Sequence, residues 1–269
     1  MIKNLILRTA WAICLVSVCV MAQAQRTRKP LKLRVMTYNI HHANPPSKAA
    51  DSVIDLKAVA AVINRVKPDL VALQEVDVHN TRAGLDVNEA EELGRLTGMH
   101  FYFTRAMYYR GGEYGDAVLS RFPITDTIGI RLPIVEGTRE EVRSLCMIKV
   151  MLPGHRELTF ASTHLGLSEE TRVMQARRLV EIVAETAGPL ILCGDLNAHP
   201  DSKPIQILDS VLTRSCTTGC KLTIPTEHPR AKIDYIMYRP KDRFKVLGQK
   251  TVRETYASDH LPVVATFRF

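Results

Sequence analysis

Short apolar runs of strand-like composition recur from residue 31 to the end of the chain, separated by polar segments that contain glycine or proline. Runs of this length and composition are typical of strands buried in a core. Roughly ten strands with few helices between them predict two packed sheets with helices outside, in one domain. The runs cover residues 31–40, 69–76, 100–107, 116–121, 145–152, 157–165, 190–195, 234–239 and 261–269.

Three helices are expected between these runs. In residues 55–66 the apolar positions recur every three to four residues and share one helical face. A second helix should begin after Ser168, a good N-cap residue, and end at Gly188. A short third helix should follow Ser202, with Pro204 in its first turn. The expected core stripe of the second helix is Val173, Ala176, Leu179, Val180 and Val183.

The segment "ILCGDLNAHP" at residues 191–200 ends a strand-like run in polar residues. Gly194 would let the backbone turn at low steric cost, and Pro200 would stop sheet pairing. Asp195 and Asn197 would then lie at the carboxyl end of a core strand, where α/β folds place their chemistry. Taken alone, the segment is better explained as a turn than as a functional site, because Asp and Asn favour turns.

The same interruption by polar residues recurs at the ends of other apolar runs. One buried polar residue is usually a satisfied structural group. Several carboxylates gathered in one place, however, need a cation or a proton to offset their repulsion. The residues concerned are Asn39, Glu75, His164, Asp195, Asn197, Asp234, Asp259 and His260.

The motifs Y-N-I, L-Q-E, T-H-L, G-D-L-N, I-D-Y and S-D-H-x-P-V occur in this order. The ordered set resembles the endonuclease/exonuclease/phosphatase superfamily from about Leu31 to Phe269, and is closest to its bacterial secreted metal-dependent hydrolases. The resemblance implies an α/β (α+β) fold, a four-layer sandwich of two facing, mostly antiparallel sheets with outer helices. It also implies a divalent-metal-dependent phosphoesterase that acts by in-line attack of an activated water.

The resemblance assigns the metal to Glu75, helped by Asn39 and Asp259. Oxygen ligands with remaining water positions suit Mg²⁺, for which Mn²⁺ could substitute. We therefore expect one metal centre around Glu75.

The resemblance also assigns the catalytic residues. Asp195 would orient or deprotonate the attacking water, and Asn197 would fix the water or a phosphate oxygen. His260, oriented by Asp234, would face the phosphoryl group across from the metal. His164 would donate to a non-bridging oxygen, and the metal and imidazolium groups would neutralise developing charge. Whether Asp195 or His260 is the general base stays open.

Three further residues are candidates for contact with the substrate. Asp116 stands where relatives often carry Asn, and it would either touch the site or face a neighbouring strand. Arg82 and Arg143 could approach a substrate phosphate, although a solvated face is the more common place for such residues. Arg121 is expected to be a structural turn residue.

The substrate class is less constrained than the chemistry. Val76 and Asp77 follow L-Q-E where abasic-site endonucleases usually show Lys, which argues against DNA repair. A phosphodiester in a lipid head group and an extracellular nucleic acid both stay open, but no basic strip with interleaved aromatic residues favours nucleic acid. A catalytically inactive binding module is the third alternative. We expect a monomer.

Residues 1–24 have the pattern of a signal peptide. Lys3 and Arg8 precede an apolar run, and Ala22-Gln23-Ala24 is a small-residue cleavage site. Cleavage after Ala24 would leave an exported domain at 25–269, periplasmic or extracellular, with 34 basic and 28 acidic residues. Its net charge of +6 weakly favours anionic substrates.

The mature chain would keep four cysteines. Cys146 and Cys193 lie in apolar runs and are expected to be buried thiols. Cys216 and Cys220 flank a turn that contains glycine, and an exported protein could join them in a disulfide.

Overall fold

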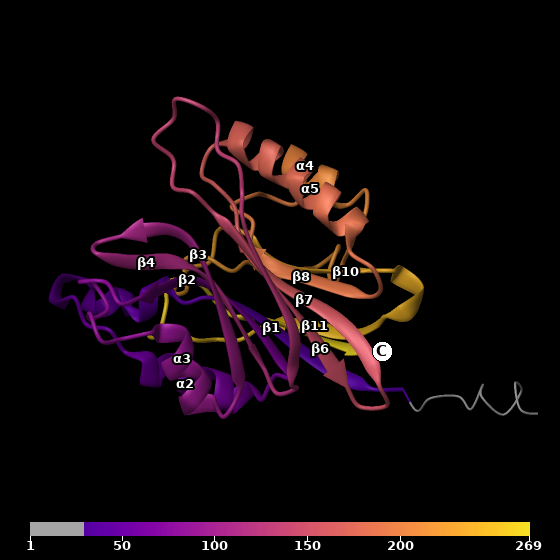
Figure 1. Ribbon diagram of the computed structural model, residues 1–269, viewed down its shortest axis with the longest axis horizontal. Helices are drawn as coiled ribbons and strands as arrows, with labels where there is room; N and C mark the ends of the chain where they lie inside the picture. The colour runs from indigo at the N-terminus through magenta and orange to yellow at the C-terminus, as the bar shows by residue number, and fades with distance from the viewer. Residues whose placement is uncertain (1–29) are drawn as a thin grey trace, which may run out of the picture. The chain divides into compact units, whose positions relative to one another are not determined.

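Two six-stranded β-sheets face each other in the computed structural model, which describes residues 30–269 (Figure 1). Residues Lys32–Phe269 form one compact unit. The expected sandwich of two mostly antiparallel sheets with outer helices is confirmed. The expected signal peptide at residues 1–24 lies outside the described residues.

The first sheet has the strand order β11-β12-β1-β2-β4-β3. Only β1 and β2 pair in parallel; the other neighbours are antiparallel. Its strands are β1 (Lys32–Asn39), β2 (Leu70–Val78), β3 (His100–Tyr109), β4 (Gly112–Ser120), β11 (Lys245–Thr251) and β12 (Val263–Arg268).

The second sheet has the strand order β5-β6-β7-β8-β10-β9. Again one pair is parallel, β7 with β8, and the others are antiparallel. Its strands are β5 (Ile124–Arg131), β6 (Ser144–Leu152), β7 (Arg156–His164), β8 (Leu190–Asp195), β9 (Thr213–Arg214) and β10 (Asp234–Arg239). Strands β5, β9 and β11 were not expected from the sequence, because β9 has only two residues and β5 and β11 are mostly exposed edge strands.

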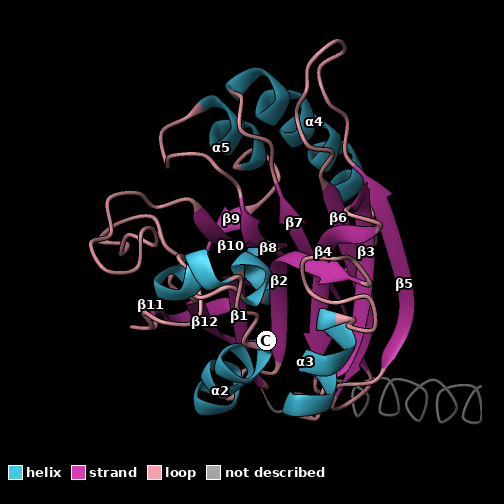
Figure 2. Ribbon diagram, turned by 90° about the vertical axis from the view of Figure 1, so that its left-hand side faces the viewer, coloured by secondary structure: helices cyan, strands magenta, loops and turns pink. Residues whose placement is uncertain are grey.

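Helices cover the outer face of each sheet (Figure 1, Figure 2). Helices α2 (Leu56–Val66) and α3 (Glu89–Thr97) pack on the first sheet, and α4 (Glu169–Glu185) and α5 (Lys203–Leu208) pack on the second. The three expected helices are confirmed, whereas α3 was not expected. Three short 3-10 helices complete the set at His41–Ala43, Pro46–Asp51 and Lys241–Arg243.

Side-chain caps fix where three of these helices, α2, α3 and α4, begin. At the start of α3 the Asn88 side chain accepts a hydrogen bond from the Glu91 backbone amide. The Asp55 carboxylate accepts a hydrogen bond from the Ala58 amide at the start of α2, and the Ser168 hydroxyl accepts one from the Thr171 amide at the start of α4. The other end of α4 differs from the expectation, since the helix stops at Glu185 rather than at Gly188. Its stripe also differs, because Val173 and Val180 are half-buried and Gln175 and Ile182 are buried in their place.

The two parallel pairs bring the functional motifs together. Parallel strands need a crossover connection, which α2 supplies between β1 and β2 and α4 supplies between β7 and β8. Asn39 lies beside Gln74 where the first pair ends, and His164 lies beside Asp195 where the second pair ends. The carboxyl ends of four strands therefore meet at one rim of the sandwich.

A polar contact joins the two sheets below this rim. The Gln74 side chain donates to the Ser162 hydroxyl at 2.9 Å, and this hydroxyl donates to the Leu73 carbonyl at 2.9 Å. Gln74 and Ser162 are fully buried, so each of these hydrogen bonds prevents an unsatisfied buried group. The contact fixes β2 of one sheet against β7 of the other.

Gly194 lies inside β8 rather than in a turn, which corrects the expected role of this residue. A Cβ atom at this position would collide with the carbonyl oxygen of Thr163 on β7. Glycine is therefore required for close approach of the β7 and β8 backbones. These strands carry His164 and Asp195 at their ends.

The cysteines behave as expected. Cys216 and Cys220 form a disulfide with a Cα–Cα distance of 5.9 Å, and Cys146 and Cys193 are buried free thiols. Within residues 30–269, the helices are all too short or too polar to cross a membrane.

We predict that Gly194→Ala lowers the free energy of unfolding by about 1–3 kcal/mol, because the added methyl group overpacks the β7–β8 contact. Chemical denaturation would measure this loss. Gly248→Ala is the matched control, since a Cβ there meets no atom within 4 Å. Equal stability of the two variants would contradict the assigned role of Gly194.

Candidate active site

The Asp195 carboxylate lies at the centre of the rim and is 2% exposed. Its Oδ1 accepts a hydrogen bond from the backbone amide of Asn197, at 2.9 Å, and its Oδ2 accepts one from the side-chain amide of Asn39, at 3.1 Å. The same Oδ2 lies 3.5 Å from His164 Nε2 and 3.6 Å from His260 Nε2. Burial raises the pKa of Asp195 to about 7, and the nearby Asp234 carboxylate acts in the same direction. The site therefore holds a carboxylate with the proton affinity of a general base.

Asp234 and His260 form a hydrogen-bonded pair beside Asp195. Asp234 begins β10 directly opposite Asp195 in the antiparallel register, so the two carboxylates are neighbours. The His260 Nδ1–H donates to Asp234 Oδ2 at 3.0 Å. Burial would lower the pKa of His260, but the Asp234 and Asp195 carboxylates outweigh it and raise the pKa to about 10. His260 is therefore an imidazolium at neutral pH, and its charge offsets the repulsion between the carboxylates.

His164 has a different electrostatic environment. Arg143 Nη1 donates to His164 Nδ1 at 3.1 Å, which leaves the ring proton on Nε2. Burial lowers the pKa of His164 well below its usual value, and the Arg143 guanidinium lowers it further. His164 is therefore a neutral donor, as its expected hydrogen bond to a phosphate oxygen requires. The positive charge at this corner is carried by Arg143.

Asn197 connects the two strand ends of the second sheet. Its side-chain amide donates to the Leu165 carbonyl at 2.9 Å and lies 3.0 Å from His164 Nε2. Its backbone is left-handed, with φ of 47°, a conformation that Asn tolerates better than most residues. The backbone therefore turns out of β8 at Asn197, and the Asn197 side chain lies at the rim beside His164.

Glu75 reaches the rim because β2 is irregular there. The pairing of β2 with β4 shifts register between Leu73 and Val76, and Glu75 has a left-handed φ of 58°. Glu75 Oε1 accepts a hydrogen bond from the side-chain amide of Asn39 at 3.0 Å. Burial would raise the pKa of Glu75, but the His42 imidazole beside it contributes to holding the pKa well below its usual value. Asn39 thus donates to both Glu75 and Asp195.

Asp259 belongs to the same rim. The hydroxyl of the preceding residue, Ser258, donates to the Asn39 carbonyl at 2.7 Å and lies 3.4 Å from Asp259 Oδ1. This contact attaches the S-D-H segment to the end of β1. Asn39 and Glu75 are therefore in direct contact, whereas Asp259 is connected to them only through Ser258 and the Asn39 carbonyl.

A cavity of about 280 Å³ opens over these groups. Arg82 and Arg143 both line it, so the expectation of a solvated face is wrong for each. Arg143 is only 4% exposed and donates to the Tyr114 hydroxyl at 3.1 Å. Arg82 forms a bidentate pair with Asp77 at 2.6 and 2.9 Å and stacks 4.6 Å from the Tyr109 ring. The full lining is Glu75, Arg82, Met107, Tyr109, Tyr114, Glu141, Arg143, His164, Leu167, Asp195, Asn197, Ile224, Ile233 and His260.

Asp116 lies below the cavity and does not line it. Its Oδ2 accepts a hydrogen bond from Ser144 of the facing sheet, and its Oδ1 is buried without a partner. Burial raises the pKa of Asp116 to about 7. Asp116 therefore contacts the facing sheet, and the cavity lining does not support its expected contact with the substrate. Arg121 is structural, as expected, since its side chain donates to the Pro68 carbonyl.

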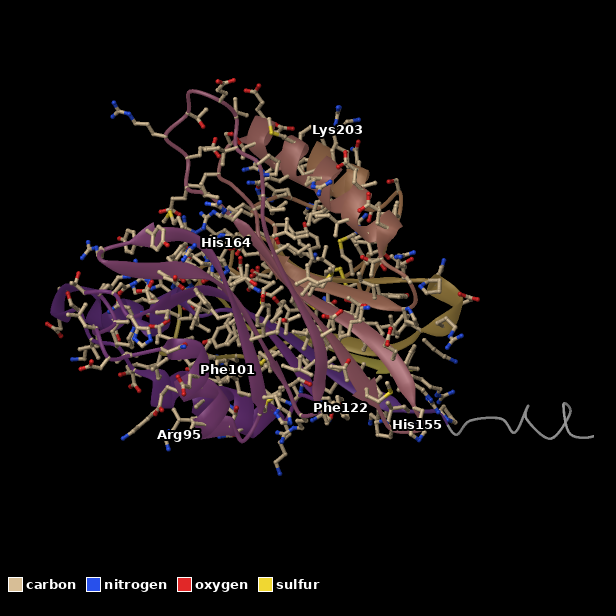
Figure 3. The ribbon with its side chains drawn as sticks, in the orientation of Figure 1. Arg95, Phe101, Phe122, His155, His164 and Lys203 are labelled. Atoms are coloured by element: carbon tan, nitrogen blue, oxygen red, sulfur yellow. A yellow bond between two sulfur atoms is a disulfide. The ribbon has the colours of Figure 1, made fainter. Side chains whose placement is uncertain are left out.

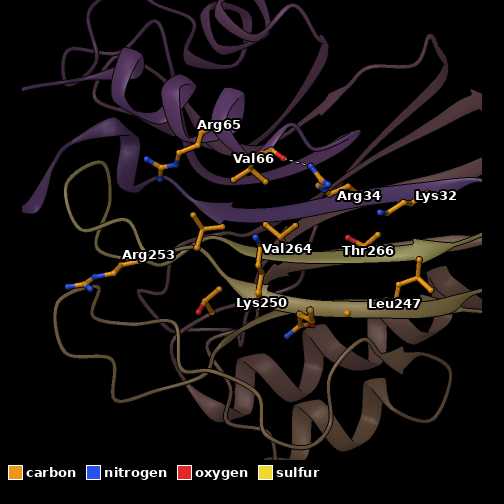
Figure 4. A pocket seen from close by; sticks show the side chains of 13 residues that line it. Lys32, Arg34, Arg65, Val66, Leu247, Lys250, Arg253, Val264 and Thr266 are labelled. Atoms are coloured by element: carbon orange, nitrogen blue, oxygen red, sulfur yellow. Dashed lines mark hydrogen bonds between the residues drawn. The ribbon is translucent and has the colours of Figure 1, made fainter.

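A second, larger groove lies on the outer face of the first sheet, between α2 and β11 (Figure 4). It is lined by basic residues, including Lys32, Lys250 and Arg253. It shares no lining residue with the cavity over Asp195. Because it holds neither histidine nor carboxylate, the chemistry is assigned to the smaller cavity.

Four residues near the site were not expected from the sequence. Tyr109 and Tyr114 lie in strands, where an aromatic residue usually signals packing. His41 and His42 follow Asn39 directly, in "NIHHAN", and their proximity to a strand-end Asn was the available signal. Their donor atoms and that of Glu75 lie within 4.8 Å of one another.

A profile of the Endonuclease/Exonuclease/phosphatase family matches residues 36–260. The chain belongs to this family. Its members are hydrolases that act on phosphoesters, so the resemblance drawn from the ordered motifs is confirmed.

Similar proteins cover most of this chain. It is 28% identical over 247 residues to the uncharacterized protein YbhP of Escherichia coli K12, covering 86% of this chain and 94% of that protein. A Caenorhabditis briggsae protein named 5'-tyrosyl-DNA phosphodiesterase is 26% identical over 277 residues, covering 89% and 70% of the two chains. A family structure from Beutenbergia cavernae has a TM-score of 0.70 at 26% identity, covering 88% and 72%.

The residues at the rim fit the divalent cation on which this family generally depends. Glu75 is an ionised carboxylate that lines the cavity. The buried Nδ1 of His42 lacks a hydrogen-bond partner and lies 3.8 Å from Glu75 Oε2. A buried nitrogen without a hydrogen-bond partner beside an ionised carboxylate is a donor pair that suits a divalent transition-metal cation.

We predict that Asp116→Asn changes how stability depends on pH. The raised pKa means that the folded protein keeps this proton up to about pH 7, whereas the unfolded chain releases it near pH 4. The stability that Asp116 contributes at low pH is therefore lost as the pH rises toward 7. Relative to wild type, the Asn variant should gain about 2–3 kcal/mol between pH 5 and pH 8.

Urea denaturation at several pH values would measure this change. Asp126→Asn, on the exposed edge strand β5, is the control and should follow the wild-type curve. A difference between Asp116→Asn and wild type that is independent of pH would show that Asp116 is ionised in the folded protein.

Proposed function

We propose that this protein is an exported, divalent-metal-dependent phosphodiesterase that hydrolyses its substrate by in-line attack of water. One observation carries the proposal: the Asp195 carboxylate faces a cavity between an imidazolium, His260, and the Asn39–Glu75 pair. A water held by this carboxylate would be oriented and deprotonated in the same place. The export rests on the expected signal peptide at residues 1–24.

The phosphoryl group would bind between donors from different elements. The Nε2 atoms of His164 and His260 lie 3.5 and 3.6 Å from the same carboxylate oxygen, Asp195 Oδ2. Arg143 adds a buried positive charge behind His164. Fixed donors of this kind stabilise charge that develops on phosphoryl oxygens in the transition state.

Asp195 would act on the nucleophile and His260 on the phosphoryl group or the leaving oxygen. The pKa of Asp195, about 7, suits proton removal from water near neutral pH. The pKa of His260, about 10, keeps a proton available for the oxygen that leaves. Asp234 fixes the orientation of the His260 ring through Nδ1.

The divalent cation would be held at Glu75, with Asn39 and Asp259 in the same group. When bound, it supplies positive charge that polarises phosphoryl oxygens and stabilises the leaving group. Mg²⁺ is the expected ion and Mn²⁺ the expected substitute. Asn39 would keep the Glu75 carboxylate in place through its side-chain amide.

The cavity wall indicates an organic group on the substrate. One part of the lining is apolar and includes Met107, Leu167, Ile224 and Ile233. Leu167 is 70% exposed at this wall, so a ligand could cover it. An amphiphilic phosphodiester, such as a lipid or glycolipid head group, has the matching chemistry.

We predict that Asp234→Asn lowers turnover by roughly 100-fold or more, because His260 loses the partner that charges and orients it. Steady-state hydrolysis of bis(4-nitrophenyl) phosphate with Mg²⁺ would measure this. Asp126→Asn on β5 is the control for the same chemical change at an exposed position. Near-normal turnover of Asp234→Asn would remove the Asp234–His260 pair from the mechanism.

We further predict that diesters are preferred to monoesters. The wild type would be assayed with bis(4-nitrophenyl) phosphate, 4-nitrophenyl phosphate, a glycerophospholipid and single-stranded DNA, each with Mg²⁺ and with Mn²⁺. Hydrolysis of the lipid above the DNA is the expected order. No hydrolysis of any ester with either ion would overturn the proposed function, and a preference for DNA would favour the secreted nuclease.

A further inference from the structure

Two consecutive histidines lie against the carboxylate proposed to hold the metal. His41 and His42 occupy the short 3-10 helix that follows β1, and Glu75 lies on the adjacent strand β2. One donor atom from each of the three residues lies within 4.8 Å of the others. Both histidines are only partly exposed. Neither is needed by the mechanism described above.

The backbone that carries these histidines is held in an unfavourable conformation. His41, His42 and Ala43 have φ values of 48°, 43° and 52°, and successive left-handed residues are costly for side chains other than glycine. The segment is fixed by the Asn39 side chain, whose oxygen accepts a hydrogen bond from the His41 amide at 3.0 Å. Backbone strain of this kind is found at functional sites.

The tautomer of His41 suits a metal ligand. Its Nδ1 lies 2.9 Å from the Asn44 carbonyl oxygen, which can only accept, so Nδ1 carries the proton. The lone pair of the neutral ring is then on Nε2. Histidines that bind metals usually donate their other ring N–H to a carbonyl or carboxylate in this way.

His42 has an open coordination position. Its Nδ1 is buried and makes no hydrogen bond, and it lies 3.8 Å from Glu75 Oε2. That separation is too long for a hydrogen bond. It is short enough for one ion to contact both atoms at about 2.1 Å.

We propose that His41 and His42 are nitrogen ligands of the divalent cation at Glu75, and that they make the site selective for Mn²⁺ over Mg²⁺. Imidazole nitrogen binds first-row transition metals well, whereas Mg²⁺ prefers oxygen. This inference rests on the proposed metal site at Glu75 and changes its expected ligand set. It assigns Mn²⁺ the role of resident ion rather than substitute.

The test uses the full-length protein loaded with Mn²⁺ alone, without substrate. Pulsed electron paramagnetic resonance would detect ¹⁴N coupling from imidazole on the bound ion. Isothermal titration would give the Mn²⁺ and Mg²⁺ affinities of each variant. The variants are His41→Gly and His42→Gly, because glycine accepts a positive φ and removes the ligand.

His155→Gly is the matched control. His155 has a φ of 54° and lies at the opposite end of β7 from His164 (Figure 3). We expect it to leave both affinities unchanged. We expect His41→Gly and His42→Gly each to lose the ¹⁴N coupling of one imidazole and to weaken Mn²⁺ binding at least about tenfold, with a much smaller change for Mg²⁺.

Glu75→Gln separates failure of this inference from failure of the proposed function. If wild-type Mn²⁺ shows no imidazole coupling while Glu75→Gln abolishes binding, the metal site stands and the histidine ligands are wrong. If Glu75→Gln binds Mn²⁺ as tightly as wild type, the proposed metal site itself is wrong. The wild-type spectrum decides the matter even where a glycine variant fails to fold.

Discussion

The site depends on two parallel strand pairs in otherwise antiparallel sheets. In an antiparallel pair, neighbouring strands end at opposite edges, so their final residues lie far apart. The parallel pairs β1–β2 and β7–β8 instead end together, and the two sheets face each other at that rim. Helices α2 and α4 are the connections that make this possible. The positions of Asn39, Glu75, His164 and Asp195 follow from this topology.

Repulsion among the acidic groups is offset in two different ways. Asp195 and Asp234 are direct neighbours across β8 and β10, and the His260 imidazolium lies beside both. The His260 imidazolium does not lie beside Glu75, and Glu75 is the carboxylate suited to a cation. The Asn39 amide lies between the two regions, donating to Glu75 and to Asp195. In one half of the site the repulsion is thus offset by the His260 proton, and the other half holds the carboxylate proposed to bind the cation.

Residues at strand ends were the most predictable from sequence, because an Asp or His within an apolar run has few structural explanations. The edge strands β5 and β11 were not, since an exposed strand needs no apolar run. Gly194 was correctly singled out for the wrong reason, because close backbone approach leaves no local signal. Arg143 was expected on a solvated face, because no neighbouring residue in the sequence indicates that its Nη1 lies 3.1 Å from His164 Nδ1.

The cavity draws its chemistry and its shape from different parts of the fold. Glu75, His164 and Asp195 belong to strands fixed by pairing on both sides, whereas Leu167, Ile224 and Ile233 come from connecting segments. Connecting segments tolerate insertion and replacement far better than paired strands do. Descendants of such a chain could therefore acquire new substrates by exchanging loops, while the hydrolytic apparatus is inherited unchanged.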